Sequence, residues 1–380
     1  MSNLKQTTIY GFSIFAMFFG SGNLVFPLMV GINNPESWIF AFLGFFLTGI
    51  ILPFLGLFVV KLYQGNYYRF FGEAGELAQL FIPLFTLSLL GPFGVIPRCI
   101  TVAHGGLEFL ELDIPLSIFS IIFCIICYIA CINNRMMFNV VGKLLSPILL
   151  LFLLLLFVQG YQQTNLITIH PLSIASIKDG FFTGYATMDL FAAFFFSGLM
   201  FQQISSITPR NKSVVAAAIA PTMLGATLLG LVYLGFVFLG AHYKYLTQNL
   251  PSELILPAIT DHLFGASGAI IISAIMILSC LTTSVALIGI YTDYLCSFTN
   301  TKNNNNPNKW HHYLLIITII ISFYISLLDF AGIFELITPL LNISYPSLIF
   351  LTITCFFVRG KKQMKFYIFY SIIFFQIILL

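Results

Sequence analysis

The residues with the clearest chemical potential are Gly20, Ser21, Gly22 and Asn23, which interrupt an apolar stretch long enough to cross a bilayer. Glycine weakens a helix, and in hydrocarbon every backbone N–H and C=O needs a partner. A break here is therefore tolerated where its freed backbone groups face protein, solute or ions. We interpret it as a solute-binding site at membrane depth, and the alternative is a kink or a tight helix–helix contact.

A second break is expected near residues 184–189, GYATMD. Secondary transporters are commonly built from two halves of inverted topology, each beginning with a broken helix. FAMFFGSG at 15–22 and FAAFFFSG at 191–198 agree at six of eight positions, although chance similarity is an alternative in a chain with 43 phenylalanines. We place the second break between Thr187 and Asp189, with Ser197 and Gly198 as the second choice.

Arg98 and Asp189 are charged residues inside predicted spans. Each costs at least about 2.5–3.5 kcal/mol at mid-membrane on insertion scales, so each needs a reason to be there. They can form one structural pair, or Asp189 can meet a substrate ammonium group or a coupling proton. A histidine proton relay is excluded, because all six histidines fall in loops or near span ends: His104, His170, His242, His262, His311 and His312.

The composition requires that these residues sit in a membrane protein. Mean hydropathy is +0.99 and only 8% of residues are charged, against about a quarter in soluble domains. We predict one all-α polytopic domain with ten full crossings and a short eleventh helix. The predicted spans are 9–31, 38–60, 78–103, 114–132, 144–160, 181–206, 214–240, 267–295, 313–328, 333–357 and 366–380.

The basic residues predict the orientation. With a cytoplasmic N-terminus, thirteen of the sixteen Lys and Arg residues lie inside, and only Lys178 and Lys244 lie outside. The outer 104–113 loop carries Glu108, Glu111 and Asp113, whereas the polar 300–309 linker is cytoplasmic. The inside set is Lys5, Lys61, Arg69, Arg135, Lys143, Arg210, Lys212, Lys302, Lys309, Arg359, Lys361, Lys362 and Lys365.

Other classes of protein are poorly supported by the residues. No cleavable signal peptide is evident, and the first apolar segment is expected to stay as helix one. Cys124, Cys127 and Cys131 share a helix face, but buried apolar thiols are favoured over a soft-metal site. No HExxH motif, phosphate-binding loop, channel filter or charged ring is seen. The net charge of +3 follows from the topology and does not argue for nucleic acid.

Five segments in order give the chain a family resemblance. They are FAMFFGSGNLVFP (15–27), LGPFGVIPR (90–98), GFFTGYATMDLFAA (180–193), CLTTSVAL (280–287) and NISYPSLIFL (342–351). They resemble the bacterial leucine/isoleucine/valine:cation symporters of the amino acid/polyamine/organocation superfamily. The resemblance implies a five-plus-five inverted-repeat fold with broken helices 1 and 6. It divides a core, 1–357, into repeats at about 9–160 and 181–357, followed by a basic loop and short helix at 358–380.

This family usually has twelve helices, so a chain ending in an eleventh helix of 15 residues is a departure. The expected location is the bacterial inner membrane, and the expected substrates are L-leucine, L-isoleucine and L-valine. Coupling is expected to Na⁺, with H⁺ as the alternative; no other cofactor and no covalent catalysis is expected. The remaining alternatives are another amino acid or a non-transporting sensor or scaffold on this fold. Oligomeric state stays open.

The predicted site must hold a zwitterion and an aliphatic side chain. Freed N–H groups at Ser21, Gly22 and Asn23, at the positive end of a half-helix, suit the carboxylate. Groups at Thr187, Met188 and Asp189 can accept from the ammonium. Neighbouring Phe and Leu side chains would bury the branched tail, although one methylene is worth only about 1–3 kcal/mol, which leaves Leu, Ile and Val unranked.

For Na⁺, the resemblance implies oxygen ligands from helix one and helix eight. They are the carbonyls of Ala16, Phe19 and Cys280 and the hydroxyls of Thr283 and Ser284. The alternative is that these hydroxyls bond to carbonyls of their own helix. Ser279, on another part of helix eight, is expected to be neutral.

Overall fold

The computed structural model describes residues 2–110, 114–132, 146–164, 172–207, 213–247, 250–299, 307–358 and 360–379, and every element in these ranges is helical. The α-helices are α1 (Ser2–Phe18), α2 (Ser21–Asn33), α3 (Trp38–Phe46), α4 (Leu52–Leu62), α5 (Tyr67–Phe71), α6 (Glu76–Leu90), α7 (Val95–Glu108), α8 (Leu116–Ile132), α10 (Ser146–Gln163), α11 (Ile174–Thr183), α12 (Asp189–Ile207), α13 (Val214–His242), α14 (Ile255–Thr299), α15 (Pro307–Ser326), α16 (Asp329–Phe357) and α17 (Lys362–Leu379). A π-helical turn, η2 (Leu47–Ile51), joins α3 to α4, and short 3-10 turns are η1 (Pro35–Ser37), η3 (Gly72–Ala74), η5 (Gly184–Thr187), η6 (Lys244–Leu246) and η7 (Ser252–Leu254).

Part of the predicted topology rests on residues outside these ranges. They are Glu111, Asp113, Arg135, Lys143, Arg210, Lys212, Lys302 and Arg359, residues 144–145, His170 and most of the 300–309 linker.

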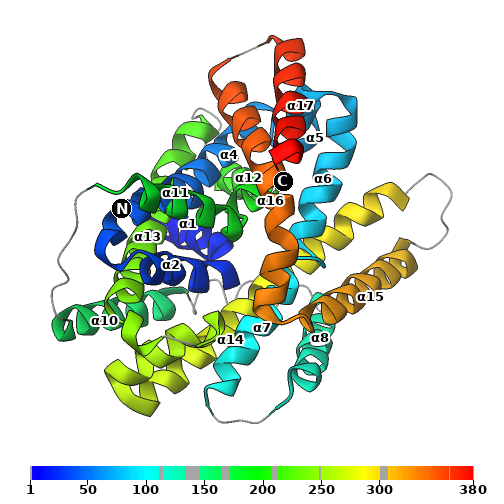
Figure 1. Cartoon of the computed structure of the whole chain (residues 1–380). Helices are drawn as coiled ribbons and strands as arrows, with labels where there is room; N and C mark the ends of the chain where they lie inside the picture. Colours follow the sequence, from blue (N-terminus) through cyan, green and yellow to red (C-terminus); the bar gives the residue numbers. More distant parts are fainter. Residues whose placement is uncertain are drawn as a thin grey trace.

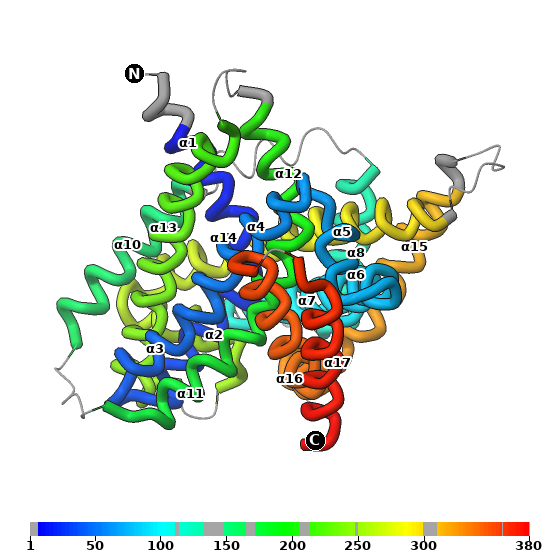
Figure 2. The backbone as a smooth tube through the Cα atoms, turned by 90° about the horizontal axis from the view of Figure 1, so that it is seen from above, coloured from blue at the N-terminus to red at the C-terminus, as the bar shows by residue number. Residues whose placement is uncertain are grey.

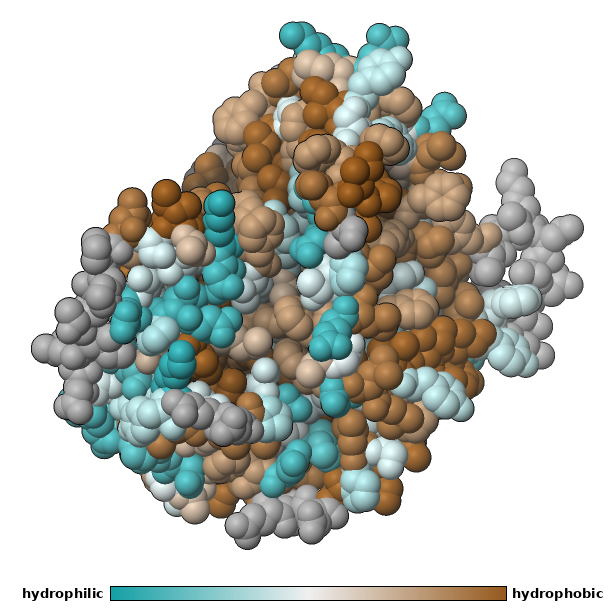
Figure 3. All heavy atoms as spheres, in the orientation of Figure 1, coloured by the Kyte–Doolittle hydropathy of each residue, from teal (hydrophilic) through white to brown (hydrophobic). Residues whose placement is uncertain are grey.

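The described helices have the lengths and compositions of membrane spans. Five continuous segments are long and apolar enough to cross a bilayer, and two bent pairs raise this number to seven. Leu116–Ile132, Pro147–Gln163 and Trp310–Ser326 are shorter apolar helices. Bulky apolar side chains are exposed along α8 and α15, and Figure 3 shows this apolar surface on the side where both helices lie. The predicted all-helical membrane class is confirmed.

Helix one is broken where its glycines predict. α1 ends at Phe18, α2 begins at Ser21, and the two halves are bent by 75°. Gly20 is extended, and its N–H donates to the side-chain oxygen of Asn23 at 3.1 Å. A Cβ at Gly20 would lie 3.1 Å from the Thr283 side chain, so the break also fits closely against α14.

Helix six is broken at the first of the two predicted positions. η5 ends at Thr187, Met188 adopts a left-handed conformation with φ of 57°, and α12 starts at Asp189. The bend is 47°. The second choice is wrong, because Ser197 and Gly198 lie inside α12, where the Ser197 hydroxyl donates to the Leu57 carbonyl at 2.7 Å.

The third span contains a break that the sequence analysis missed. We predicted a continuous helix at 78–103, but α6 and α7 are separated by a turn at 91–94, GPFG. A Cβ at Gly94 would lie 2.1 Å from the Leu89 carbonyl oxygen, so the turn requires glycine there. α14 is also interrupted, at Gly265, where φ is 67°, just before the predicted eighth span at 267–295.

Segments far apart in sequence pack as five main helix pairs. α1 and α2 lie along α13, α3 lies along α11, α4 along α12, and α7 along α14 (Figures 1 and 2). Glycines let two of these pairs approach closely. A Cβ at Gly31 or Gly240 would lie 2.1 Å from a carbonyl oxygen of the other helix, and Gly44 and Gly180 do the same between α3 and α11 at 2.0 and 1.9 Å.

The last helix is anchored by a buried cation. Lys365 Nζ lies 2.7 Å from Glu73 Oε2, and the Lys365 side chain is 1% exposed. α17 begins at Lys362 rather than at 366, and its 18 residues extend it to about 27 Å at 1.5 Å per residue. The predicted length of 15 residues was therefore too short.

Candidate functional site

The two breaks meet through one carboxylate. Asp189 Oδ2 accepts from Asn23 Nδ2 at 2.9 Å and from Tyr233 Oη at 3.0 Å, and Asn23 Nδ2 also contacts Tyr233 Oη. All three side chains are buried. Asn23 lies in the first turn of α2, just after the first break, Asp189 begins α12 after the second, and Tyr233 of α13 contacts both side chains. Sequence analysis brought Asn23 and Asp189 together but missed Tyr233, because nothing in its local sequence distinguishes it from a core tyrosine.

The backbones of the breaks also touch. A Cβ at Gly22 would lie 3.4 Å from Thr187 Cα, so glycine allows these two backbone segments to approach to van der Waals distance. The Thr187 hydroxyl donates to the Gly184 carbonyl at 2.9 Å and accepts from the Asp189 N–H at 3.3 Å. Thr187 thus caps its own turn. The six residues predicted to bind substrate, Ser21, Gly22, Asn23, Thr187, Met188 and Asp189, lie together.

Arg98 is close to this point but does not pair with Asp189. Its Nη1 donates to the Ala186 carbonyl at 2.7 Å, and the guanidinium carbon lies 5.3 Å from the centre of the Phe26 ring. No Arg98–Asp189 N–O distance is within 4.0 Å among the ion pairs of the described residues. The structural pair, one of the two alternatives for these charges, is therefore not formed. Arg98 instead bonds to the Ala186 carbonyl at the helix-six break, which joins α7 to that break.

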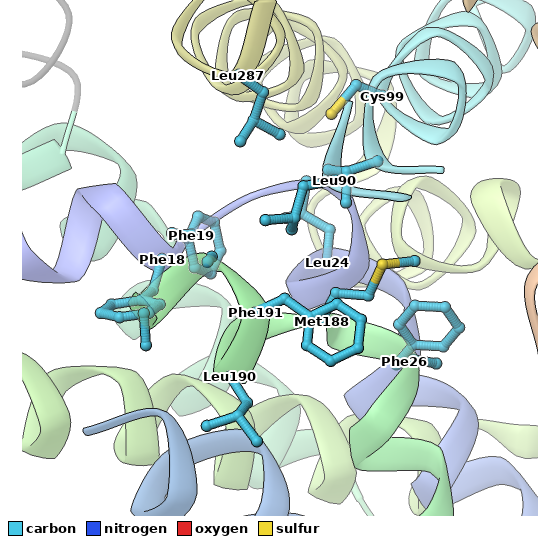
Figure 4. Close-up of a cluster of buried hydrophobic side chains, with 14 of the residues drawn as sticks. Phe18, Phe19, Leu24, Phe26, Leu90, Cys99, Met188, Leu190, Phe191 and Leu287 are labelled. Carbon is cyan, nitrogen blue, oxygen red and sulfur yellow. The ribbon is translucent and has the colours of Figure 1, made fainter. Parts of the chain in front are cut away.

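Apolar side chains from several helices surround the breaks. Figure 4 shows Leu24, Phe26, Leu90, Met188, Phe191 and Leu287 gathered from α2, α6, α12 and α14 and from the turn before α12. Tyr345 of α16 stacks on Tyr185 and Phe191, with ring centres 4.5 and 4.6 Å away. Polar groups are thus few and are set in an apolar environment, as in binding sites for small molecules.

The predicted cation ligands also converge at the first break. The Gly20 N–H is taken by Asn23 and the Asn23 N–H by the Gly20 carbonyl, so the Ala16 and Phe19 carbonyls lack their usual partners four residues on. Thr283 lies against Gly20, and the buried Ser284 hydroxyl has no hydrogen-bond partner.

Two neighbours of this cluster were missed. Cys99 of α7 donates to the Ser21 hydroxyl at 3.3 Å, in the same neighbourhood as Cys280 and Ser284. Ser279 was expected to be neutral, yet its hydroxyl donates to the Phe19 carbonyl at 3.2 Å. Ser279 therefore contacts helix one at the first break, and the effect of removing its hydroxyl stays a prediction. Within the described part of the chain, no three His, Cys, Asp or Glu side chains are grouped as metal ligands.

A cavity of about 540 Å³ opens beside the second half of helix six. One wall is formed by Lys61 of α4, Tyr67 of α5 and Gln64 of the turn between them, and α12 forms the other with residues that include Phe195 and Gln202. Lys61 Nζ lies 5.0 Å from the centre of the Phe201 ring. The cavity is therefore lined partly by the helix that carries Asp189.

Comparison with known proteins identifies a family whose model matches this chain. A family model described as branched-chain amino acid transport protein matches residues 3–380. A protein of Staphylococcus aureus named as a branched-chain amino acid carrier is 27% identical over 386 residues, covering 94% of this chain and 84% of the relative. A Staphylococcus epidermidis protein of the same name is 26% identical, with the same coverage.

Solved transporters share the fold at low sequence identity. A Na⁺-coupled sialic acid symporter in an outward-open, substrate-bound state matches with a TM-score of 0.57, 14% identity and coverage of 93% of this chain and 79% of its own. MhsT in complex with L-phenylalanine matches with a TM-score of 0.56, 14% identity and coverage of 96% and 98%. The nucleobase-cation-symport transporter Mhp1 gives 0.57 at 15% identity, covering 97% and 91%.

Proposed function

Because this chain belongs to the family of branched-chain amino acid transport proteins, we propose that it imports leucine, isoleucine and valine by cation symport, with Na⁺ as the coupling ion. Members of this family are transporters and not enzymes. The observation that carries the proposal is the meeting of the two helix breaks, which gathers a buried carboxylate and freed backbone groups among apolar side chains.

The zwitterion head group would lie between the breaks. The N–H groups of Ser21 and Gly22 belong to the positive end of α2, and Gly22 lies against Thr187 of the helix-six break, so these groups would suit the substrate carboxylate. Asp189 suits the ammonium, together with backbone oxygens around Thr187 and Met188. Asn23 acts by holding Asp189 in place. The branched tail would pack against the apolar cluster of Figure 4.

Na⁺ would bind next to the substrate, on the α14 side of the first break. The Ala16 and Phe19 carbonyls, the Cys280 carbonyl and the Thr283 and Ser284 hydroxyls supply the oxygen ligands that this hard cation prefers. Their support is the missing helical partners of the two helix-one carbonyls and the unpartnered Ser284 hydroxyl. Binding of Na⁺ and binding of the amino acid would be coupled because both would contact the backbone of the first break. Proton coupling through the buried Asp189 is the second candidate.

Transport would proceed by alternating access between two inverted repeats, 9–160 and 181–357, with a cytoplasmic N-terminus. The inverted repeat would relate span one (α1 and α2) to span six (α11 and α12), and span two (α3 and α4) to span seven (α13). It would therefore relate the α2–α13 pair to the α11–α3 pair. Both pairs are present, and each closes through two glycines, Gly31 with Gly240 and Gly180 with Gly44. This correspondence supports the repeat proposal.

Uptake of radiolabelled leucine into proteoliposomes tests the function. We expect accumulation of leucine when Na⁺ is imposed outside, competition by isoleucine and valine, and little accumulation from a pH gradient alone. Accumulation from a pH gradient without Na⁺ would favour the proton-coupled alternative. No binding or uptake of any of the three amino acids would contradict the function.

A further inference from the structure

Arg98 is a buried cation whose donors are mostly unused. The residue is 1% exposed, and only Nη1 has a hydrogen-bond partner, the Ala186 carbonyl. Nε and Nη2 have none. A guanidinium presents its donors in a rigid fork that matches a carboxylate, so two unused donors leave a site for one planar anion.

The guanidinium group of Arg98 lies where the two helix breaks meet. Its one partner, Ala186, belongs to η5, three residues before Asp189. The guanidinium stands over the Phe26 ring, which also borders Gly22. Nearby, the Tyr345 hydroxyl is buried without a partner, and its ring stacks on aromatic side chains at both ends of the helix-six break. Arg98 is thus placed beside the backbone groups already assigned to the substrate.

The charges on the two sides of the break complement an amino acid. Asp189 is held by neutral groups, Asn23 and Tyr233, and Arg98 is held by a neutral carbonyl. Neither charge neutralises the other by direct contact. The zwitterion of an α-amino acid carries an ammonium and a carboxylate on the same carbon, so one molecule can satisfy both residues at once.

We propose that Arg98 is a substrate-binding residue whose Nε and Nη2 hold the α-carboxylate of the amino acid, with Tyr345 Oη as an additional donor. This inference rests on the proposed function and makes the carboxylate, rather than the branched tail, the group that the site selects most strongly. A site built around a charged partner rejects analogues that lack it far more strongly than an apolar pocket rejects a missing methylene.

The test compares ligands that differ at one end. Binding to the purified full-length protein is measured for leucine, leucinamide, isoamylamine and 4-methylvalerate in wild type, Arg98→Gln and Arg98→Lys. In wild type we expect the two amines without a carboxylate to bind at least about 100-fold more weakly than leucine. In Arg98→Gln, leucine should lose about 100-fold in affinity while leucinamide changes less than about threefold. Arg98→Lys, which keeps the charge but not the fork, should be intermediate.

Arg69→Gln is the matched control, because Arg69 is exposed and bonds to Gln64. Its ligand preferences should equal those of wild type. Wild type binding leucine and leucinamide equally, or Arg98→Gln keeping its preference for leucine, would overturn the proposal while leaving the proposed function intact. If Arg98→Gln does not fold, the wild-type ligand series and Arg98→Lys still decide.

A halide ion could use the same donors, and a chloride-free arm distinguishes it. Leucine affinity should be unchanged when gluconate replaces chloride. A loss of affinity that chloride restores would assign Arg98 to an inorganic anion and overturn the carboxylate proposal. Absence of binding of leucine, isoleucine and valine to wild type would instead be a failure of the proposed function.

Discussion

Asn23 Nδ2 and Asp189 Oδ2 lie 2.9 Å apart, although 166 residues separate them in sequence. Asn23 lies in the first turn of α2 and Asp189 is the first residue of α12, so this one bond joins the two interrupted helices just after their breaks. The same Asn23 side chain also accepts a hydrogen bond from the Gly20 N–H through its Oδ1 atom. The shape of the first break and the position of the Asp189 carboxylate are therefore fixed together.

Asp189→Asn is expected to abolish transport without unfolding the protein. An amide oxygen can still accept from Asn23 and Tyr233, and no ion pair with Arg98 is lost. The apparent melting temperature should change by only a few degrees, while leucine affinity falls by about 10-fold or more for loss of a charged contact. Thermal unfolding and leucine binding on the same preparation measure this. A variant that unfolds, and is rescued by also neutralising Arg98, would instead indicate a structural charge pair.

Tyr233→Phe should act through Asp189. It removes one hydrogen bond from a buried carboxylate, at a cost of about 1–3 kcal/mol, and leaves the packing against Phe45 in place. Leucine affinity and stability should both fall moderately. Tyr324→Phe is the control, since this tyrosine is exposed on α15. Equal behaviour of both variants would show that Tyr233 Oη does not support the site.

Ser284→Ala should raise the Na⁺ concentration for half-maximal uptake by about tenfold, because one oxygen ligand is lost. Leucine affinity at saturating Na⁺ should change little. Thr282→Ala is the matched control, since the Thr282 hydroxyl bonds to the Ser279 carbonyl of its own helix. Ser279→Ala is unsuitable as a control because of its bond to Phe19. Superimposable Na⁺ titrations of Ser284→Ala and wild type would remove Ser284 from the cation site.

Gly31→Val should destabilise the protein, because even a Cβ at this position would lie 2.1 Å from the Val237 carbonyl oxygen on α13. Overpacking of this kind costs about 1–3 kcal/mol or more. Gly289→Ala is the control, since a Cβ there meets nothing within 4 Å. Thermal unfolding in detergent compares the two, and similar stabilities would contradict the close approach of α2 and α13.

The predicted orientation can be tested at described, exposed positions. Glu108→Cys should react with an impermeant thiol reagent in intact cells, whereas Lys362→Cys should react only after the membrane is opened. Wild type controls for the native cysteines. Labelling of both variants in intact cells would contradict a cytoplasmic N-terminus.

Local sequence was sufficient to predict most of the architecture. Apolar segments of spanning length predicted the helices, and Gly20, Gly22 and the GYATMD segment predicted the two breaks. The turn at 91–94 was missed because hydropathy stays high across it, although two glycines and a proline in four residues signal it. Partner choice could not be predicted. Whether Arg98 contacts Asp189 or a carbonyl depends on how three helices are rotated against one another, and no local pattern encodes that rotation.

The most direct test of the account is leucine uptake into proteoliposomes under an imposed inward Na⁺ gradient, with equal Na⁺ on both sides as the comparison. The account predicts transient accumulation of leucine above its external concentration only when the gradient is present, with Asp189→Asn reduced to the level of protein-free vesicles. Leucine uptake that is identical with and without the gradient, or that survives in Asp189→Asn, would contradict it.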